Sequence, residues 1–265
     1  MRPNPLRAAI QRGDVLIGTW LVALRTPAIL ALLRSAGLDF VRIDMEHGGF
    51  TIETVADMAV LARNLDLGLV VRPPIANREW ITQLLDIGVW NLHCPQVDTP
   101  EHAAEIVAAS RYSPMGLRGM GPRGTATDFD RAGTPEARAF ANREVFITVM
   151  LESRKAFENL DPIAAMPGID ALTLGPHDLC QDLGVLDTPD HDKVLDEKRR
   201  ELITAAHKYG KVTTMLAADV AQSKKLRAAG IQMIAYANEV EVLHGAFSGI
   251  VSAIRDRQQK PTTGP

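Results

Sequence analysis

One pattern recurs eight times along this chain of 265 residues and constrains its fold more than any other feature: a short apolar run, a polar turn and an amphipathic helix. The apolar runs are predicted strands, and they cover residues 15–22, 39–44, 67–73, 91–97, 145–153, 169–176, 211–217 and 231–238. Nearly continuous apolar strands indicate burial on both faces, as in a parallel sheet covered by helices. Eight such units predict one α/β domain over residues 1–257, a single (β/α)8 TIM barrel, followed by a polar tail at 258–265.

A doubly wound open sheet is the alternative fold. It is disfavoured because no GxGxxG motif follows the first predicted strand and because eight full units are present. Hydrophobic residues make up 46% of the chain and aromatic residues only 5%. The apolar mass is therefore mostly Ala, Leu, Val and Ile, which suits the side-chain layers that fill a closed barrel.

The repeat is interrupted between residues 112 and 142 by a Gly-rich, charged segment that has the character of an inserted loop. A short helix is expected at residues 135–142. Long loops in compact domains often act as functional lids. Arg118 and Arg123 in this loop have two open interpretations: they bind the acidic tail of an acceptor, or they belong to a solvated lid.

Charge and composition exclude several classes of partner. The net charge is −3 and no basic stretch is long enough to follow a phosphate backbone, so we expect no nucleic acid. No apolar run reaches the roughly 20 residues that span a bilayer, and the N-terminal segment lacks the apolar centre of a signal peptide. Cys94 and Cys180 have no CxxC spacing and are expected to be reduced thiols. These features predict a cytoplasmic protein without a membrane partner.

Ionisable side chains follow four of the predicted strands. Asp44, Glu46 and His47 end the second strand, Arg72 the third, Glu152 the fifth, and the segment Gly175, Pro176, His177 and Asp178 the sixth. Barrel enzymes carry their chemistry at the carboxyl ends of the strands. Each residue alone could be a helix cap or a solvated charge. The whole set favours a functional site, because the opposite ends of the strands carry no comparable collection.

These residue types together suit enolate chemistry. Glu152 and Asp178 are 26 residues apart, one βαβ step, and a carboxylate pair completed by water is a usual Mg²⁺ or Mn²⁺ site. Arg72 would neutralise charge growing on a substrate oxygen. His47 is the natural general base, since histidine exchanges protons near neutral pH, and Asp44 would orient its imidazole. No lysine ends these strands, which argues against a Schiff-base aldolase.

Six segments in order carry a family resemblance: DFVRIDMEHG, VVRP, QLLDIGV, SRYSPMGLRGMG, LESRKAFENLDPI and GPHDLCQDLG. Over nearly its whole length the chain resembles the HpcH/HpaI metal-dependent aldolases, which include 4-hydroxy-2-oxoheptanedioate and 2-keto-3-deoxy-sugar-acid aldolases. The resemblance implies a divalent metal (Mg²⁺, Mn²⁺ or Co²⁺). It also implies reversible cleavage of a 4-hydroxy-2-oxo acid to pyruvate, or a close 2-oxo acid, and an aldehyde.

The resemblance also implies roles for individual residues. Glu152 and Asp178 would be the metal ligands, Arg72 would contact the keto or enolate oxygen, and His47 with Asp44 would form a base dyad acting through water. The backbone of residues 175–178, which includes Gly175, Pro176 and His177, would hold the substrate carboxylate. Trp20 would line the pocket and Leu216 would border the aldehyde. Asp86 would serve a neighbouring subunit's site in a homo-oligomer, commonly a hexamer built as a trimer of dimers.

Three positions depart from the family pattern. Met150 replaces a glutamine found two residues before the metal-binding glutamate in many members. Pro122 replaces a serine that touches substrate in some relatives, and AYANE at residues 235–239 replaces a glycine–valine–aspartate run. The metal, arginine and histidine set is intact, so these departures concern the choice of acceptor more than the type of reaction.

Two other functions stay open at this stage. The same enolate would serve a decarboxylase of oxaloacetate or a citrate-lyase-like enzyme that uses coenzyme A thioesters, although we see no nucleotide site in the sequence. A non-catalytic sugar-acid-binding barrel is the third possibility. It is disfavoured because binding alone needs no histidine base.

Overall fold

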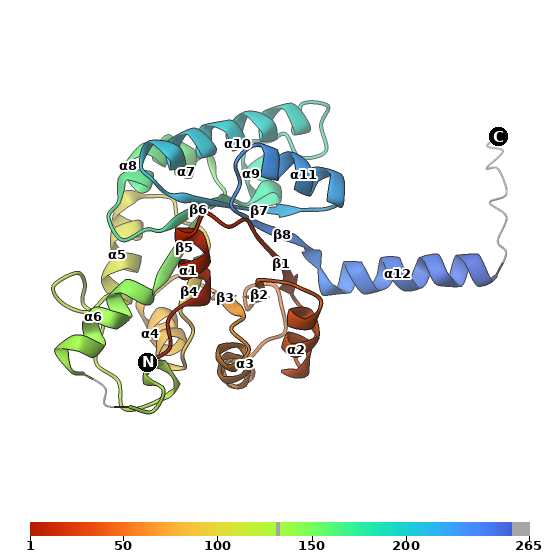
Figure 1. Cartoon of the computed structure of the whole chain (residues 1–265). Helices are drawn as coiled ribbons and strands as arrows, with labels where there is room; N and C mark the ends of the chain where they lie inside the picture. The colour runs from red at the N-terminus through yellow and green to blue at the C-terminus, as the bar shows by residue number, and fades with distance from the viewer. Residues whose placement is uncertain (131–132, 256–265) are drawn as a thin grey trace, which may run out of the picture.

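A computed structural model describes residues 1–130 and 133–255 of the chain. Eight parallel strands close into a barrel in chain order, which confirms the predicted fold (Figure 1). The strands are β1 Leu16–Leu21, β2 Phe40–Asp44, β3 Gly68–Arg72, β4 Asn91–Cys94, β5 Phe146–Leu151, β6 Ala171–Leu174, β7 Val212–Ala217 and β8 Met233–Asn238. The expected tail at 258–265 lies outside the described residues.

Prolines set the ends of several strands. β3 stops before Pro73 and β4 stops before Pro95, so both strands are shorter than the predicted ranges. A proline has no N–H to donate to a neighbouring strand, which explains why pairing ends there. β6 stops before Gly175 and Pro176, where the chain turns directly into a helix.

The helices are more numerous than the expected one per strand. Their bounds are α1 Pro5–Gln11, α2 Ala28–Ser35, α3 Ile52–Asn64, α4 Arg78–Asp86, α5 Pro100–Ser110, α6 Pro135–Glu144, α7 Arg154–Glu158, α8 Leu160–Ala165, α9 Pro176–Asp182, α10 His191–Lys208, α11 Val220–Ala228 and α12 Glu239–Ile254. Two helices follow β5 and two follow β6, so strict alternation was wrong. Side chains of Thr51, Asn77 and Thr99 cap α3, α4 and α5. Pro27 occupies the N-cap position of α2, and no side chain caps this helix.

The inside of the barrel changes from apolar to polar along the strands. Near the amino ends it is filled by Leu16, Phe40, Val70 and Phe146, with Leu6 of α1 plugging the opening. Gly68 makes room for this plug, since a Cβ there would lie 2.4 Å from Leu6 Cγ. Higher up, the buried side chains are polar: Arg42, His93, Thr148, Thr173 and Thr214. Apolar layers therefore fill the lower half of the barrel, and the upper half, next to the mouth, is polar.

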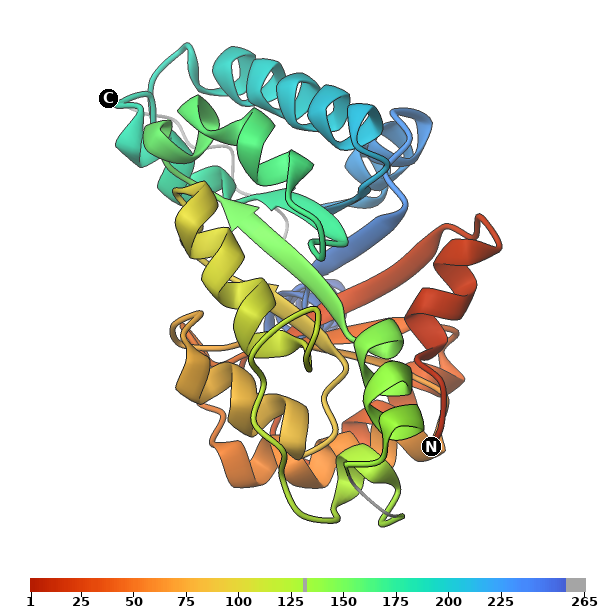
Figure 2. The ribbon, with the colours of Figure 1, turned by 90° about the vertical axis from the view of Figure 1, so that its left-hand side faces the viewer.

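The inserted segment folds against the amino ends of the strands. It contains the short 3-10 helix Thr125–Thr127 and the helix α6. α6 confirms the helix expected at 135–142 and continues to Glu144. α6 lies beside the N-terminal segment (Figure 2), and Asn4 donates hydrogen bonds to the Glu144 carboxylate and carbonyl at 2.8 Å each. This placement holds α6 on the face opposite the barrel mouth.

The last helix leaves the body of the molecule. Figure 1 shows α12 extending away from the barrel, and all of its residues after Glu239 are exposed. Its exposed apolar side chains are Val240, Val242, Leu243, Phe247, Ile250, Val251 and Ile254. In a closed barrel the eighth helix would normally cover β8 and β1. In the described part of the chain no helix is long and apolar enough to cross a membrane.

Candidate active site

A cavity of about 610 Å³ opens at the carboxyl ends of the strands. It brings together most of the residues predicted for the site: Trp20, Asp44, His47, Arg72, Gly175, Pro176, His177, Asp178 and Leu216. They come from β1, β2, β3, β6 and β7 and from the loops that follow them. Glu152 lies directly behind Gly175, where a Cβ would come 2.4 Å from Glu152 Oε2. Of the predicted residues only Asp86 lies elsewhere.

Arg72 is held by two carboxylates from the second strand and its loop. Its Nε donates to Asp44 Oδ1 at 2.9 Å and its Nη2 to Asp44 Oδ2 at 2.5 Å. Its Nη1 lies 3.0 Å from Glu46 Oε2. The hydrogen bonds to Asp44 use two of the five guanidinium N–H groups, and the contact with Glu46 is an ion pair without a hydrogen bond to Oε2, so the two N–H groups of Nη1 are left for a substrate oxygen. The pair Asp44–Arg72 is buried and fork-shaped, which fixes the arginine in one orientation.

No direct hydrogen bond joins the Asp44 carboxylate to the His47 imidazole, the pair predicted to form a base dyad. Besides Arg72, the Asp44 carboxylate accepts hydrogen bonds from the backbone amides of Glu46 and His47 at 3.0 and 3.2 Å. The His47 imidazole is exposed, and its Nε2 lies 3.9 Å from Glu46 Oε2. Burial opposes ionisation of Asp44, but the hydrogen bonds and charge of Arg72 hold its pKa below the ordinary value. Asp44 therefore positions Arg72 and the loop rather than the imidazole.

This arrangement predicts the behaviour of Asp44→Asn. We expect kcat/KM to fall about 100-fold, because Arg72 loses the charged fork that orients it. The midpoint of the acid limb of the pH–rate profile should stay within about 0.3 units of wild type, because the imidazole has no contact with Asp44 to lose. Exposed Asp57→Asn on α3 is the matched control. A displacement of this midpoint by about one pH unit would instead support a base dyad of Asp44 and His47.

Glu152 is a buried carboxylate with a strongly raised pKa. It is 6% exposed, and its Oε1 accepts a hydrogen bond of 2.7 Å from the backbone N–H of Gln96. Burial raises the pKa of Glu152 to about 7, helped by the nearby charges of Asp178 and Glu46 and opposed by the Gln96 hydrogen bond and Arg72. The charges of Asp178 and Glu46 thus act on Glu152 in the same direction as its burial, and the charge of Arg72 acts against them.

The residues present fit a hard divalent cation. Glu152 and Asp178 offer oxygen donors from adjacent strand ends, and Gly175 leaves the space beside Glu152 Oε2 free of a side chain. A cation between these carboxylates would relieve the repulsion that raises the pKa of Glu152. Among the described residues no cluster of three or more His, Cys, Asp or Glu side chains surrounds this point. The remaining ligands would therefore be water or substrate oxygens.

The raised pKa predicts a pH dependence of metal affinity. Because Glu152 must lose its proton to bind a cation, and its pKa lies at about 7, the Mn²⁺ affinity should be about tenfold lower at pH 6 than at pH 8. Calorimetry in two buffers of different ionisation enthalpy should detect a proton released on binding at pH 6. Glu152→Gln should remove both effects. An affinity that does not change across this range would contradict the assignment of Glu152 as a ligand.

The floor of the cavity contains residues that the sequence analysis did not select. Arg42 is 1% exposed, lies 4.9 Å from the Trp20 ring and donates to Thr214 Oγ1 at 2.8 Å. Burial lowers the pKa of Arg42 to about 9, with a further contribution from Arg72 and opposition from Asp44. His93 packs edge-on against Trp20 at 5.4 Å, and burial, then the charges of Arg42 and Arg72, hold its pKa well below the ordinary value. His93 is therefore neutral and Arg42 charged at pH 7.

A buried glutamate explains one departure from the expected sequence pattern. Glu239, the last residue of AYANE, is 5% exposed and accepts hydrogen bonds from the backbone amides of Val22, Ala23 and Leu24. It fastens the loop between β1 and α2 to the end of β8. Val22 and Asn238, at the two ends of this link, both line the cavity. The departure therefore shapes the cavity wall without adding a free carboxylate to it.

Asp86 and the arginine-containing loop form a separate group. Asp86 is the last residue of α4, at the amino-end face of the barrel, and its Oδ1 accepts a hydrogen bond of 2.8 Å from Arg118 Nη2. Arg118 lies 4.7 Å from the Tyr112 ring. Pro122 and Arg123 line a small hollow beside this pair rather than the 610 Å³ cavity. Within one subunit, this loop does not cover the cavity.

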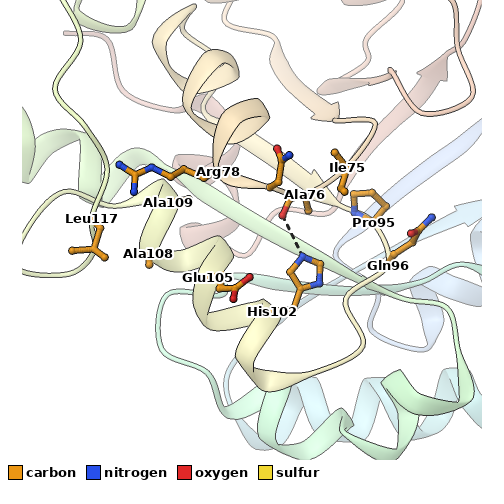
Figure 3. A pocket seen from close by; sticks show the side chains of 11 residues that line it. Ile75, Ala76, Arg78, Pro95, Gln96, His102, Glu105, Ala108, Ala109 and Leu117 are labelled. Atoms are coloured by element: carbon orange, nitrogen blue, oxygen red, sulfur yellow. Dashed lines mark hydrogen bonds between the residues drawn. The ribbon is translucent and has the colours of Figure 1, made fainter.

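A second hollow of about 480 Å³ lies on the outer surface between α4 and α5 (Figure 3). His102 faces the loop after β3, with its Nε2 3.2 Å from the carbonyl oxygen of Ala76. Gln96 borders this hollow and also contacts Glu46 and Glu152. The hollow brings together no carboxylate pair with an arginine at its mouth, and we assign no chemistry to it.

Comparison with known sequences and structures agrees with this geometry. The family described as HpcH/HpaI aldolase/citrate lyase matches residues 17–246. The chain belongs to this family.

A hydroxypyruvate/pyruvate aldolase of Deinococcus radiodurans is 34% identical over 261 residues, covering 97% of this chain and 92% of that protein. A 2-keto-3-deoxy-L-rhamnonate aldolase of Klebsiella pneumoniae is 36% identical over 236 residues, covering 88% and 86%. An HpcH/HpaI aldolase structure from Desulfitobacterium hafniense has a TM-score of 0.89 at 30% identity, covering 98% of this chain and 99% of that chain.

Three features of the site in this HpcH/HpaI family member were not predicted from the sequence. Glu46 was noted at the strand end but not assigned a role, and it contacts Arg72 and Gln96. Gln96 reaches Glu152 through a backbone with a φ of 55°, which no sequence pattern indicated. Arg42 had a detectable signal, because it lies two residues before Asp44 and must therefore face the same side of β2.

Proposed function

We propose that this chain is a class II, divalent-metal-dependent aldolase that reversibly cleaves 4-hydroxy-2-oxo acids. The products would be pyruvate, or a close 2-oxo acid such as hydroxypyruvate, and an aldehyde. The observation that carries the proposal is that Arg72 and Asp178 line one cavity and that both act electrostatically on Glu152, which lies behind the cavity residue Gly175. Two relatives of the chain are named hydroxypyruvate/pyruvate aldolase and 2-keto-3-deoxy-L-rhamnonate aldolase, which supports the same reaction.

The chain's own residues would divide the work among them. A cation held by Glu152 and Asp178 would supply positive charge for the oxygen of the enolate. Arg72 would donate its two free N–H groups to the same oxygen, oriented by Asp44. The backbone at residues 175–178 begins α9 and would hold the substrate carboxylate. His47, exposed at the mouth, would move the proton, with access to water. Leu216 would border the aldehyde.

The direct test is an assay for the products. The purified chain is incubated with a 4-hydroxy-2-oxo acid and Mg²⁺, Mn²⁺ or Co²⁺, and pyruvate and aldehyde are measured together. We expect equal amounts of both, formed only when a metal is present. In a parallel incubation, conversion of oxaloacetate to pyruvate and carbon dioxide, without cleavage of the 4-hydroxy-2-oxo acid, would instead identify the decarboxylase, and a requirement for a coenzyme A thioester would identify the citrate-lyase-like alternative. Binding of a sugar acid without any product would identify a non-catalytic barrel.

The exposed face of α12 supports a homo-oligomer. The helix leaves its own barrel, and its apolar side chains have no cover among the described residues. A second copy offers the matching surface, because its own β8–β1 side equally lacks this helix. Exchange of α12 between two copies would give a dimer, and three dimers the expected hexamer. Light scattering tests this assembly directly, and a monomer would contradict it.

Asp86 predicts a result in mixed oligomers. In its own subunit it lies at the barrel face opposite the cavity, so it would act only in a neighbour's site. Co-expression of Asp86→Ala with Arg72→Ala chains should therefore restore up to about a quarter of wild-type activity, since one site in four then receives both intact residues. Each variant alone is the control. No recovery in oligomers that contain both chains would contradict shared sites.

The two cysteines support placement in a reducing compartment such as the cytoplasm. Cys94 and Cys180 are both free and buried. Burial raises the pKa of Cys94 to about 12, which keeps it an unreactive thiol.

A further inference from the structure

The first residue of α12 is a buried carboxylate without a cation beside it. Glu239 is 5% exposed, and it takes part in no ion pair with any residue that the structure describes. Its Oε1 accepts hydrogen bonds from the backbone N–H groups of Ala23 at 2.6 Å and Leu24 at 2.8 Å, and both of its oxygens lie 3.0 Å from the Val22 nitrogen. Successive backbone N–H groups can form a concave anion-binding site. Here the bound anion is a side chain, so the loop after β1 is fixed from the end of β8.

The same loop also contacts the loop that follows β2. The Val22 carbonyl oxygen accepts a hydrogen bond of 3.2 Å from the backbone N–H of Gly49. Gly48 lies against the same oxygen, since a Cβ there would come 3.0 Å from it and 2.2 Å from the carbonyl oxygen of Asp44. Only a glycine permits this close approach of the two loops. Val22 therefore connects Glu239, through its N–H, with the loop after β2, through its C=O.

His47 lies between two fixed points of the loop after β2. On one side its own backbone N–H donates to the Asp44 carboxylate at 3.2 Å. On the other side Gly49 is held by Val22. The imidazole is exposed at the cavity, and its Nε2 lies 3.9 Å from Glu46 Oε2. The backbone on either side, rather than a close side-chain contact, therefore determines where the imidazole lies.

The backbone just before Glu239 is in an unusual conformation. Ala237 lines the cavity and has a φ of 44°, which residues with a Cβ rarely adopt. The pairing of β1 with β8 also shifts register between Gly18 and Trp20. Strained backbone persists only where the surrounding contacts hold it. The hydrogen bonds of Glu239 to the loop after β1 supply such contacts.

We propose that Glu239 is a positioning residue for His47 and acts through Val22 and Gly49. This inference rests on the proposed function, in which His47 moves the proton during enolate formation. Glu239 itself touches no reacting group. Its carboxylate fixes the loop after β1, that loop holds Gly49, and the imidazole is thereby kept at the cavity.

The effect should be confined to proton transfer. The carboxylates proposed to hold the metal follow β5 and β6, on the far side of the closed barrel from β1 and β2. Glu46 has its own contacts, with Arg72 at 3.0 Å and Gln96 at 3.1 Å. Loss of the Glu239 carboxylate should therefore leave the affinities for Mg²⁺ and pyruvate within about twofold of wild type, while the rate of proton transfer falls.

The test is a double-mutant cycle on the exchange of the pyruvate methyl protons with Mg²⁺ in D₂O. Glu239→Gln keeps the size of the side chain, but it removes the charge and places an NH₂ group against the Val22 N–H. We expect it to slow exchange about tenfold in the wild-type background. In His47→Asn the same change should slow exchange less than about twofold, because the positioned residue is absent. Glu197→Gln, exposed on α10, is the matched control and should change neither rate.

An equal slowing in both backgrounds would overturn the proposal, because a general structural defect would affect both alike. If His47→Asn exchanges the protons as fast as the wild type, His47 is not the base and the positioning role fails, while the aldolase proposal stands. If the wild type exchanges no pyruvate protons with Mg²⁺, Mn²⁺ or Co²⁺, the aldolase proposal itself fails.

A second measurement does not depend on activity. Hydrogen–deuterium exchange of the backbone amides, followed by mass spectrometry, should be about fivefold faster for residues 45–50 in Glu239→Gln than in the wild type, and unchanged for β5 and β6. Unchanged exchange at residues 45–50 would overturn the link between Glu239 and Gly49, whatever the kinetics. If Glu239→Gln does not fold, Glu239→Asp, which keeps the charge but shortens the side chain, is measured with the same expectations.

Discussion

Replacing Glu152 with glutamine is expected to reduce metal-dependent turnover by about 10³-fold or more, because the change removes a charged metal ligand and keeps its shape. In the absence of metal, the Glu152→Gln variant should be no less stable than the wild type. The pKa of Glu152 is raised to about 7 by burial, so its contribution to stability is present at low pH and lost as the pH rises through 7. At pH 8 the wild type contains the buried charge and the variant does not. The Tm of the variant should therefore equal or exceed that of the wild type.

The measurement combines steady-state kinetics with thermal unfolding in EDTA. Glu158→Gln is the matched control, because Glu158 is exposed on the adjacent helix α7 and faces no cavity. It should change neither quantity. Full activity in Glu152→Gln would contradict the assignment of Glu152 as a metal ligand. A large fall in Tm at pH 8 would show that the carboxylate is structural.

Replacing Arg72 with lysine is expected to lower kcat/KM by about 10² to 10³-fold, although the charge is kept. Lysine cannot reproduce the fork that contacts both oxygens of Asp44 at 2.9 and 2.5 Å. Both side chains are nearly buried, so breaking this pair should also destabilise the fold by about 3 kcal/mol at pH 7. Because Arg72 helps to hold the pKa of Asp44 below its ordinary value, this loss should begin to shrink as the pH falls below about 4, the unfolded value, and should disappear only below the lower pKa of folded Asp44.

Denaturant unfolding at pH 7 and pH 3.5 measures the stability part, and turnover at saturating metal measures the catalytic part. Arg78→Lys, at an exposed position on α4, is the control. Wild-type kinetics in Arg72→Lys would mean that charge alone suffices and that the fork has no function. An equal loss of stability at both pH values would show that the loss does not come from the Asp44–Arg72 ion pair.

The sequence was sufficient to predict the barrel because its eight apolar runs have only one parallel arrangement that closes. It was less informative about α1, since a helix of 7 residues is too short to show a hydrophobic period. The direction in which α12 leaves the barrel could not be predicted from the sequence either. Its apolar face predicts that it packs against something, but whether that surface belongs to its own barrel depends on the direction in which the chain leaves β8.

The site shows the same division. Residues at strand ends were predictable because parallel strands present their carboxyl ends at one face. The pairing of Asp44 with Arg72 was also within reach, since both end neighbouring strands and they are register partners. The expected Asp44–His47 contact failed because the chain turns after Asp44 and directs its carboxylate back to backbone amides. Contacts made by Gln96 depend on a loop conformation that sequence patterns do not encode.

The most direct test of the central claim is deuterium exchange of the pyruvate methyl protons in D₂O, followed by NMR. The account predicts exchange catalysed by the chain with Mg²⁺, Mn²⁺ or Co²⁺, abolished by EDTA and restored when the metal is added back. Exchange that continues in EDTA would contradict a metal-dependent enolate. Absence of exchange with all three ions would contradict enolate formation from pyruvate at this site.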